Sequence, residues 1–140
     1  TQIVSRGKSV YGHLLPGLVA ERENADGTIE RIGLLTYNVS EDNQECEITT
    51  LDSLEPGQGV GTALVEAFIV SMKEAGYQRL WLIITNDNLP ALKFWQKRGF
   101  ELVAVYRNAI EAARRLKPQI PILGMGGIPI RDEIELEYRL

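Results

Sequence analysis

The sequence contains very little cysteine and histidine, the residues that build disulfides and most zinc sites. Among its 140 residues are one cysteine, Cys46, and one histidine, His13. A single cysteine cannot close an internal disulfide, and one cysteine with one histidine cannot form a Cys/His zinc site. We therefore expect neither a disulfide-stabilised fold nor a metal site.

The sequence also lacks an excess of positive charge and any long apolar run. It has 15 Lys and Arg residues against 19 Asp and Glu residues, a net charge of −4, whereas proteins that bind nucleic acid or anionic membranes need a basic face. No apolar run approaches the roughly 20 residues that cross a bilayer, and residues 1–6 lack the apolar stretch of a signal peptide. These features predict a cytoplasmic protein with neither a nucleic-acid nor a membrane partner.

The composition that remains is typical of one globular domain. Hydrophobic residues make up 44% of the chain and charged residues 24%, which are ordinary values for a folded protein. At roughly 150 residues per domain, the chain corresponds to a single domain, 1–140. A domain of this size buries on the order of two-thirds of its unfolded surface, so a hydrophobic core can form.

The apolar residues of the first part of the chain are spaced as in strands. Segments 18–23 and 29–39 flank the turn sequence Asn24-Ala25-Asp26-Gly27, which predicts a β-hairpin. Residues 46–51 predict a third strand beside it, whereas residues 1–16 show only a weak pattern. An antiparallel meander is therefore expected here.

Helices and strands alternate in the rest of the chain. From Val60 to Met72 the apolar side chains recur with the spacing of one helix face, and Gly76 provides a C-terminal stop. The elements expected to follow are a strand at 80–84, a helix beginning after Asn88, a strand at 100–106, a short helix at 109–116 and a strand at 134–140. This order predicts an α/β (α+β) fold, a mixed, mainly antiparallel sheet flanked by helices, with a central β-α-β unit.

A glycine-rich segment, Pro56-Gly57-Gln58-Gly59-Val60-Gly61-Thr62, separates a predicted strand from a predicted helix. Glycines let the backbone approach a ligand and adopt positive φ, and the N–H groups at a helix start bind phosphate or pyrophosphate. The segment is not a Walker loop, because the Gly-Lys-Ser/Thr ending is missing. A dinucleotide-binding fold would open with this turn, whereas three predicted strands precede it. By itself the segment is equally compatible with a tight strand-to-helix turn.

A second pattern lies in the helix that begins after Asn88. Asn88, Ala91, Trp95, Gly99 and Phe100 are spaced as Asn-x-x-Ala-x-x-x-aromatic-x-x-x-Gly-Phe. Together with the upstream glycine-rich segment, this spacing resembles the GNAT superfamily of acyl-CoA-dependent N-acyltransferases. The resemblance extends over residues 29–106, and the closing strand fits the final hairpin of that family.

The resemblance implies a reaction and a cofactor site. Members of this family transfer an acyl group, here expected to be acetyl from acetyl-CoA, directly to an amine in a ternary complex, and no metal is involved. In the family the glycine-rich segment holds the CoA pyrophosphate, backbone groups of the preceding strand contact the pantetheine arm, and the second helix flanks the thiol end. The cofactor-binding residues so implied are Leu51, Gly57, Gln58, Gly59, Val60, Gly61, Thr62, Asn88, Ala91 and Trp95.

Glu47 and Tyr106 are the candidate catalytic residues. An attacking ammonium must first lose a proton to a base, and the family often places an acidic residue on the strand where Glu47 lies, where strand alternation would give it the face of Leu51. The alternative for Glu47 is a solvated or ion-paired strand residue. The family commonly uses a tyrosine on the second helix to protonate the CoA thiolate, but the residue here is Trp95, whose indole cannot act as that acid. That role would pass to Tyr106 or to water.

A thiol nucleophile made of Cys46 and His13 is the less favoured alternative chemistry. Members of the family transfer the acyl group directly. A cysteine flanked by strand residues usually packs as a small hydrophobe. Cys46 is therefore expected in the core.

Two further departures from the family pattern bear on function. Pro56 stands where the family usually has Gln or Arg, and proline has no N–H to donate to a phosphate. Only 17 residues precede Leu18, so the N-terminal strand and helices of the family are expected to be shortened or absent. Apolar surface left uncovered in this way favours a homodimer. A GNAT-shaped protein that binds acyl-CoA, or only a partner, without transferring a group is the competing interpretation.

Overall fold

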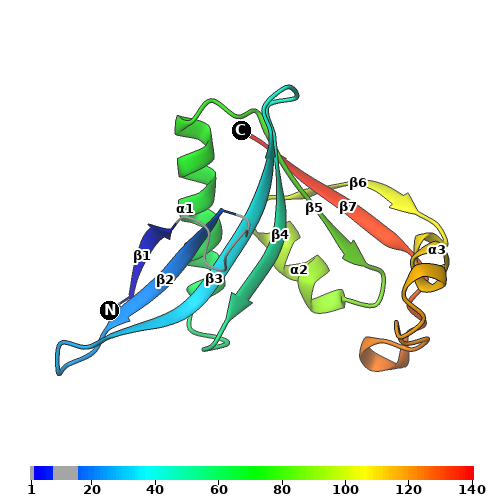
Figure 1. Ribbon diagram of the computed structural model, residues 1–140, viewed down its shortest axis with the longest axis horizontal. Coiled ribbons are helices and arrows are strands. Elements are labelled where there is room, and N and C mark those ends of the chain that lie inside the picture. The colour runs from blue at the N-terminus through cyan, green and yellow to red at the C-terminus, as the bar shows by residue number, and fades with distance from the viewer. Residues whose placement is uncertain (1, 8–15) are drawn as a thin grey trace. The chain divides into compact units, whose positions relative to one another are not determined.

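The computed structural model describes the backbone of residues 2–7 and the complete residues 16–140 (Figure 1). The chain forms two compact units. The first contains Thr1–Leu80 with Arg139–Leu140, and the second contains Trp81–Tyr138. Among the described residues, no helix combines the length and the apolar character that crossing a membrane would require.

The first unit is built on an antiparallel sheet. Its strands are β1 (Gln2–Gly7), β2 (Gly17–Glu23), β3 (Ile29–Ser40) and β4 (Glu45–Ser53), and each is hydrogen-bonded to the next along the chain. The sequence pattern predicts no strand in residues 1–16, whereas β1 pairs along its whole length with β2. The weak local pattern could not reveal this strand, because the exposed edge of β2 supplies its hydrogen bonds.

The predicted hairpin between β2 and β3 is confirmed. The backbone N–H of Gly27 donates to the carbonyl of Asn24 at 2.9 Å, and the N–H of Thr28 donates to the Asp26 carboxylate at 3.0 Å. Gly27 has φ +86°, a conformation that side chains other than glycine rarely adopt. The turn residues therefore fix the register of the two strands.

The helix α1 (Val60–Glu74) packs against β2, β3 and β4. Its buried face consists of Val60, Leu64, Val65, Phe68 and Met72, the spacing that the sequence predicted. Gly33 on β3 permits a close approach, because a Cβ at this position would lie 2.5 Å from Cγ1 of Val60. The start of α1 is therefore held directly against the sheet.

The second unit contains the remaining elements. These are β5 (Arg79–Thr85, whose first two residues belong to the first unit), α2 (Leu89–Lys97), β6 (Glu101–Tyr106), α3 (Ala109–Leu116), a short 3-10 turn (Met125–Gly127) and β7 (Glu133–Arg139). The strands lie in the order β5-β7-β6, and β6 and β7 are antiparallel. The predicted succession of elements, and with it the mixed, mainly antiparallel α/β fold, is confirmed.

A group of aromatic side chains forms the core of the second unit. The ring of Trp95 meets that of Phe100 at 4.9 Å, and Phe100 meets Tyr138 at 5.4 Å between ring centroids. Gly99 has φ +98°, and a Cβ there would lie 3.1 Å from the Tyr138 ring. The Gly-Phe pair that ends the second sequence pattern thus turns the chain from α2 into β6 and packs it against β7.

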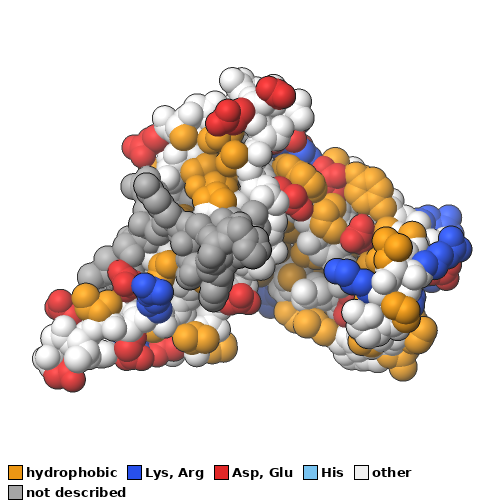
Figure 2. All heavy atoms as spheres, viewed as in Figure 1, with side chains coloured by type: hydrophobic (Ala, Val, Ile, Leu, Met, Phe, Trp, Pro, Cys, Tyr) orange, Lys and Arg blue, Asp and Glu red, His pale blue; other side chains and the backbone are white. Residues whose placement is uncertain are grey.

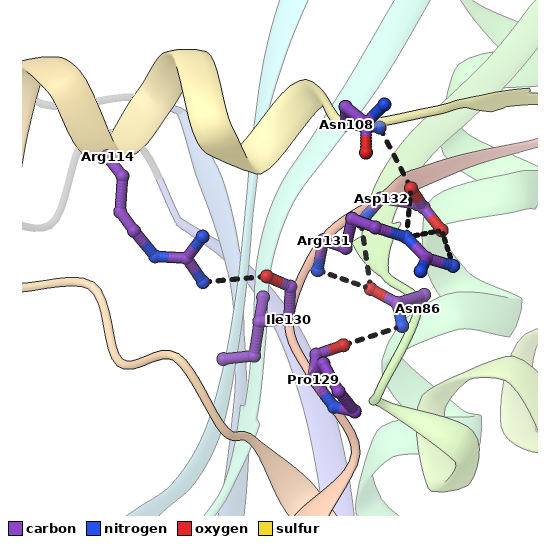
Figure 3. Close-up of polar contacts among 7 residues, drawn as sticks. All are labelled: Asn86, Asn108, Arg114, Pro129, Ile130, Arg131 and Asp132. Atoms are coloured by element: carbon purple, nitrogen blue, oxygen red, sulfur yellow. Dashed lines mark hydrogen bonds and ion pairs between the residues drawn. The ribbon is translucent and has the colours of Figure 1, made fainter.

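Asn86 holds the long connection between β6 and β7 in place (Figure 3). Its Oδ1 accepts from the backbone N–H groups of Arg131 and Asp132, both at 2.9 Å, and its Nδ2 donates to the carbonyl of Pro129 at 2.9 Å. The Asp132 carboxylate accepts from the N–H of Asn108 at 2.9 Å. The two ends of the connection are therefore tied together beside the end of β5.

Candidate functional site

The glycine-rich segment forms an open turn between β4 and α1. Gly57 and Gly59 have φ of +82° and +79°, and a Cβ at either would meet nothing within 4 Å. These glycines are therefore required by backbone conformation and not by crowding. Residues 56–59 are all exposed, so the turn presents its backbone to the solvent.

The start of α1 is free of competing charge. Gly59 is the N-cap residue, no side chain caps the helix, and the first turn carries no acidic residue. The first N–H groups of an α-helix have no acceptor within the helix, and they lie at the positive end of its dipole. The turn is therefore electrostatically suited to an anion such as a phosphate group.

Two contacts fix the chain as it enters this turn. The N–H of Leu54 donates to the carbonyl of Ile32 at 2.8 Å, and the Glu55 carboxylate forms an ion pair with Arg22 of β2. The ion pair is partly exposed, so its main effect is to position the backbone that leads to Pro56. The turn is thus attached at its first residues to β2 and β3.

A β-bulge interrupts β4 at Thr49. Leu35 pairs with Leu51 and Tyr37 pairs with Ile48, so three residues of β4 span the distance of two on β3. The buried hydroxyl of Thr36 lies 2.8 Å from the hydroxyl of Thr49 and 2.6 Å from that of Thr50. Nothing in the sequence pattern signals this bulge, because it depends on the pairing between two strands.

The bulge corrects one expectation about Glu47. Ile48 and Leu51 pair with Tyr37 and Leu35, which alternate onto one face of β3, the face where the Tyr37 ring meets Phe68 of α1 at 4.8 Å. Glu47 therefore points to the opposite face of the sheet from Leu51, and the prediction that the two share a face is wrong. The extra residue at the bulge reverses the alternation.

The carboxyl of Glu47 is half-buried, and this burial raises its pKa above the ordinary value for glutamate. Glu47 lies opposite Asn38 in the pairing of β3 with β4. A carboxylate with a raised pKa is a stronger base than an exposed one. Its environment is thus compatible with proton transfer.

A hollow of about 520 Å³ opens on the sheet of the first unit. Apolar and charged groups both line it: Val19, Arg31, Gly33, Leu34, Asp52, Ser53 and Leu54. Asp52 and Leu34 are paired across β4 and β3. The hollow therefore lies beside the end of β4 that leads into the glycine-rich turn.

In the second unit, Asn88 is the N-cap of α2. Its Oδ1 accepts from the N–H of Ala91 at 3.2 Å, while its Nδ2 has no hydrogen-bond partner among residues 16–140. Pro90 lies in the first turn, as the sequence predicted. The Oδ1 atom of Asn88 thus caps the helix, while its Nδ2 remains available as a hydrogen-bond donor.

Trp95 and Tyr106 are both engaged in contacts of the second unit. Trp95 is 6% exposed and packs edgewise on Phe94 and Phe100. Tyr106, at the end of β6, donates its hydroxyl proton to the Glu135 carboxylate of β7 at 2.5 Å. Ala91 is half-buried on α2.

Cys46 lies in the core of the first unit. It is fully buried, its Sγ donates to the sulfur of Met72 at 3.4 Å, and burial raises the pKa of its thiol to about 11. Such a thiol stays protonated at neutral pH and is a poor nucleophile. His13, the other member of the alternative nucleophile pair, lies outside the described residues.

The structure therefore groups the candidate residues unit by unit. Glu47, Leu51 and residues 57–62 lie on one continuous stretch of the first unit, and the α2 residues lie with Tyr106 in the second. Among residues 16–140, no group of three or more His, Cys, Asp and Glu side chains is placed to hold a metal ion.

Comparisons with known proteins relate the chain to one family. The sequence model of the "Acetyltransferase (GNAT) family" matches residues 14–100. The "Uncharacterized protein YdhI" of Bacillus subtilis (strain 168) is 48% identical over 120 residues, which are 86% of this chain and 71% of that protein.

Two solved structures share the fold. The "IAA acetyltransferase from Bacillus cereus ATCC 14579" superposes with a TM-score of 0.78 at 19% identity and covers 100% of both chains. A GNAT family acetyltransferase from Elizabethkingia anophelis with acetyl-CoA bound has a TM-score of 0.78 at 19% identity, over 99% of this chain and 98% of its own.

Proposed function

The chain belongs to the acetyltransferase (GNAT) family, and on that premise we propose that it is an N-acetyltransferase that uses acetyl-CoA as co-substrate and a primary amine as acceptor. The observation that carries this proposal is the open, positively polarised turn at the start of α1. Its glycines have positive φ, it is exposed, and the first turn of α1 carries no acidic side chain, features that suit a pyrophosphate. The related structure with acetyl-CoA bound supports the choice of co-substrate.

In this proposal backbone N–H groups of Gly57 and of residues 59–62 bind the CoA pyrophosphate, since the N–H of Gln58 donates to the carbonyl of Glu55 at 3.3 Å. A charge at a helix start is stabilised by about 0.3–1 kcal/mol at an exposed site, so several hydrogen bonds must add to the dipole. Pro56 can donate none. The neighbouring Gln58 is exposed and its side-chain amide can supply a donor in its place.

The remainder of the cofactor is assigned on the family pattern. Backbone groups at Leu51, beyond the bulge of β4, are proposed to contact the pantetheine arm. Asn88, Ala91 and Trp95 of α2 are proposed to flank the thiol end, with the unpaired Nδ2 of Asn88 as a donor. Trp95 would serve there through the packing of its ring and not through proton transfer.

The proposed reaction is direct transfer. Glu47 accepts a proton from the acceptor ammonium, and the resulting amine nitrogen attacks the thioester carbonyl of acetyl-CoA. The tetrahedral intermediate then collapses: the N–C bond remains, the C–S bond breaks, the nitrogen loses its second proton to solvent, and the CoA thiolate leaves and takes up a proton. Tyr106 is the proposed donor of that proton. It can act only when its hydroxyl is released from Glu135.

The same proposal places the protein in the cytoplasm as a homodimer, with an amine acceptor and without a nucleic-acid or membrane partner. The net charge of −4 supports the choice of a cationic acceptor over an anionic one. The hollow that contains Asp52 offers one carboxylate for such an acceptor.

A second candidate function is acyl-CoA binding without transfer. Two residues favour this binding function. The indole of Trp95 cannot act as an acid, and the hydroxyl of Tyr106 donates its proton to Glu135. Release of free CoA thiol from acetyl-CoA in the presence of a panel of primary amines separates the two functions. Amine-dependent release supports transfer, whereas acetyl-CoA binding with no release across the panel favours the binding function.

The first test is thermal unfolding with acetyl-CoA, CoA and ATP. A ligand at 100 times its Kd stabilises the folded state by roughly 2.7 kcal/mol, which for a domain of this size raises Tm on the order of 10 °C. We expect this shift with acetyl-CoA and CoA but not with ATP. Absence of the shift would contradict the proposal.

Two matched glycine variants locate the binding site. Gly59→Ala and Gly76→Ala both force a side chain into positive φ, at +79° and +91°, where a Cβ would meet nothing within 4 Å. Both should lower Tm by a similar amount, since the backbone strain is alike. Only Gly59→Ala should lose the acetyl-CoA shift, because Gly76 lies just beyond the opposite end of α1. An equal loss in both variants would contradict a site at this turn.

A further inference from the structure

The hollow on the sheet of the first unit carries two charges of opposite sign. Arg31 of β3 and Asp52 of β4 both line this space of about 520 Å³. Both side chains are exposed, and within the part of the chain that the structure describes neither has a hydrogen bond or an ion pair. One cationic and one anionic group therefore remain available to a ligand that enters the hollow.

The pairing of β3 with β4 places Asp52 on the same face of the sheet as Glu47. Asp52 lies opposite Leu34, and Glu47 lies opposite Asn38. Leu34 and Asn38 are four residues apart on β3, an even number, so their side chains and those of their partners share one face. At about 3.3 Å per residue, the two carboxylates are roughly 13 Å apart along the strand.

Arg31 lies on this face as well, farther from Glu47 than Asp52 does. Val19 of β2 lies opposite Leu34, and Glu21, two residues along β2, lies opposite Arg31. No ion pair joins Arg31 to Glu21. Figure 2 shows acidic and basic side chains exposed together over the hairpin of β2 and β3 that Figure 1 labels. The order along the face is therefore Glu47, Asp52, Arg31.

This order of charges matches the order of groups in one class of amine. In the proposed reaction Glu47 meets the reacting ammonium of the acceptor. A second ammonium of the acceptor would pair with Asp52, and a carboxylate beside it would accept two hydrogen bonds from the guanidinium of Arg31. An ammonium and a carboxylate side by side are the head group of a free α-amino acid.

The separation of the two carboxylates limits the length of this acceptor. Side chains stand roughly perpendicular to a sheet, so the carboxylates of Glu47 and Asp52 keep the spacing of the backbone. Six single bonds of about 1.5 Å, in an extended chain, advance roughly 7.5 Å. A charge-assisted hydrogen bond at each end adds about 2.8 Å. The total of roughly 13 Å is the span of an amino acid in which six bonds join the two nitrogens, as in lysine.

We propose that the acceptor is a free α-amino acid of the size of lysine, acetylated on its side-chain amine. Asp52 binds the α-ammonium and Arg31 binds the α-carboxylate. The acetyl group moves from the CoA sulfur to the side-chain nitrogen, so the C–S bond breaks, a C–N bond forms, and the products are the acetylated amino acid, CoA thiol and one proton. This inference rests on the proposed function, because it takes Glu47 as the base of acetyl transfer.

Three acceptors that differ by one charge each test the two binding groups. They are L-lysine, 1,5-diaminopentane, which lacks the carboxylate, and 6-aminohexanoic acid, which lacks the α-amine. The measurement is the initial rate of CoA thiol release from acetyl-CoA over a range of acceptor concentrations. We expect kcat/KM for lysine to exceed that for each of the other two about tenfold, since each lacks one hydrogen-bonded charge pair.

Two variants assign each charge of the acceptor to one residue. Asp52→Asn should raise KM about tenfold for lysine and diaminopentane but not for aminohexanoic acid. Arg31→Gln should raise KM about tenfold for lysine and aminohexanoic acid but not for diaminopentane. Asp42→Asn and Arg115→Gln make the same charge changes at exposed positions outside the hollow, and they should leave all three KM values unchanged.

Calorimetric titration of lysine into the CoA-loaded protein gives a second readout that does not require turnover. Wild type should bind lysine, and Asp52→Asn should bind it about tenfold more weakly. Lysine binding of this kind without CoA release from any amine would support the site and contradict the transfer reaction.

The other outcomes separate this inference from the proposed function. Equal kcat/KM for the three acceptors, or equal effects of both variants on all of them, would overturn the amino-acid acceptor and leave acetyl transfer standing. CoA release with other primary amines but not with lysine would do the same. Absence of both lysine binding and lysine-dependent release would overturn the inference, while the thermal shift with acetyl-CoA reports the cofactor site independently.

Discussion

At the scale of single residues, Glu47 shows how surroundings change the chemistry of a side chain. Burial raises the pKa of its carboxyl, and the β4 bulge directs it to the face of the sheet opposite Leu51. Cys46, its neighbour in the chain, points into the core instead. Both residues are candidates from the sequence, but a thiol with a pKa of about 11 stays protonated at neutral pH, so Glu47 remains the candidate base.

We predict that Glu47→Gln lowers kcat for acetyl transfer about 100-fold, the lower end of the range for loss of a general base. Its raised pKa should place the acid limb of the wild-type kcat/KM profile above the ordinary value for glutamate. The measurement is the pH profile of CoA release with an acceptor amine. A variant that keeps wild-type kcat would show that Glu47 is not the base.

The stability of the same variant provides a control. Because the pKa of Glu47 is higher in the folded than in the unfolded chain, the unfolded state loses this proton first as pH rises. The protonated Glu47 carboxyl therefore contributes its full stabilisation at a pH below its pKa in the unfolded chain. This stabilisation is lost as the pH rises through its pKa in the folded chain. Glu47→Gln should therefore gain stability relative to wild type across that window. A drop in Tm at neutral pH would instead indicate damage to the fold.

At the scale of elements, side chains at the ends of helices and strands do most of the positioning. Asn88 begins α2 through its Oδ1, while its Nδ2 is the proposed donor to the cofactor. Asn86 secures the connection between β6 and β7 by accepting from two N–H groups and donating to one carbonyl. Both residues lie near the end of β5, but Asn88 caps a helix whereas Asn86 anchors a loop.

Substitution at Asn88 separates helix capping from cofactor binding. Asn88→Ala should lower the free energy of unfolding by about 1 kcal/mol, because the cap is lost. Asn88→Asp should keep the cap and the wild-type Tm but weaken acetyl-CoA binding, since a carboxylate cannot replace the Nδ2 donor. Calorimetric titration and thermal unfolding of both variants provide the comparison. Unchanged acetyl-CoA affinity in Asn88→Asp would remove Asn88 from the cofactor site.

Asn86→Ala should release the connection between β6 and β7. Loss of its three hydrogen bonds should lower the free energy of unfolding by about 2–3 kcal/mol. Hydrogen exchange should accelerate most at the amides of Arg131 and Asp132, whose acceptor is removed. Exchange that is unchanged at these amides would contradict the role assigned to Asn86. Asn86→Asp, which keeps the acceptor, should protect them.

At the scale of the whole molecule, the elements could largely be predicted and their long-range relations could not. Local residue types specify the hairpin at Gly27, the helix from Val60 and the cap at Asn88, so the sequence predicted these features. The strand β1, the bulge at Thr49 and the ties made by Asn86 depend on partners distant in the chain, and no local pattern encodes them.

Cys46 offers a measure of global stability. Its buried thiol, with a pKa of about 11, should react with a thiol reagent only when the first unit unfolds. Saturating acetyl-CoA should slow the reaction about 100-fold, in line with its stabilisation of the folded state. Time courses of thiol modification with and without acetyl-CoA supply the measurement. Rapid reaction of the folded protein would contradict the burial of Cys46.

The sequence by itself determined the family, the order of the elements and the location of the glycine-rich turn. These follow from glycine conformation, helix capping and hydrophobic spacing, which act over a few residues. Only the tertiary structure decided which face Glu47 occupies and what Tyr106 donates to, and it alone placed Asp52 on the same face as Glu47. Those properties depend on pairing and burial between residues far apart in the chain, and their energies appear only when the strands meet.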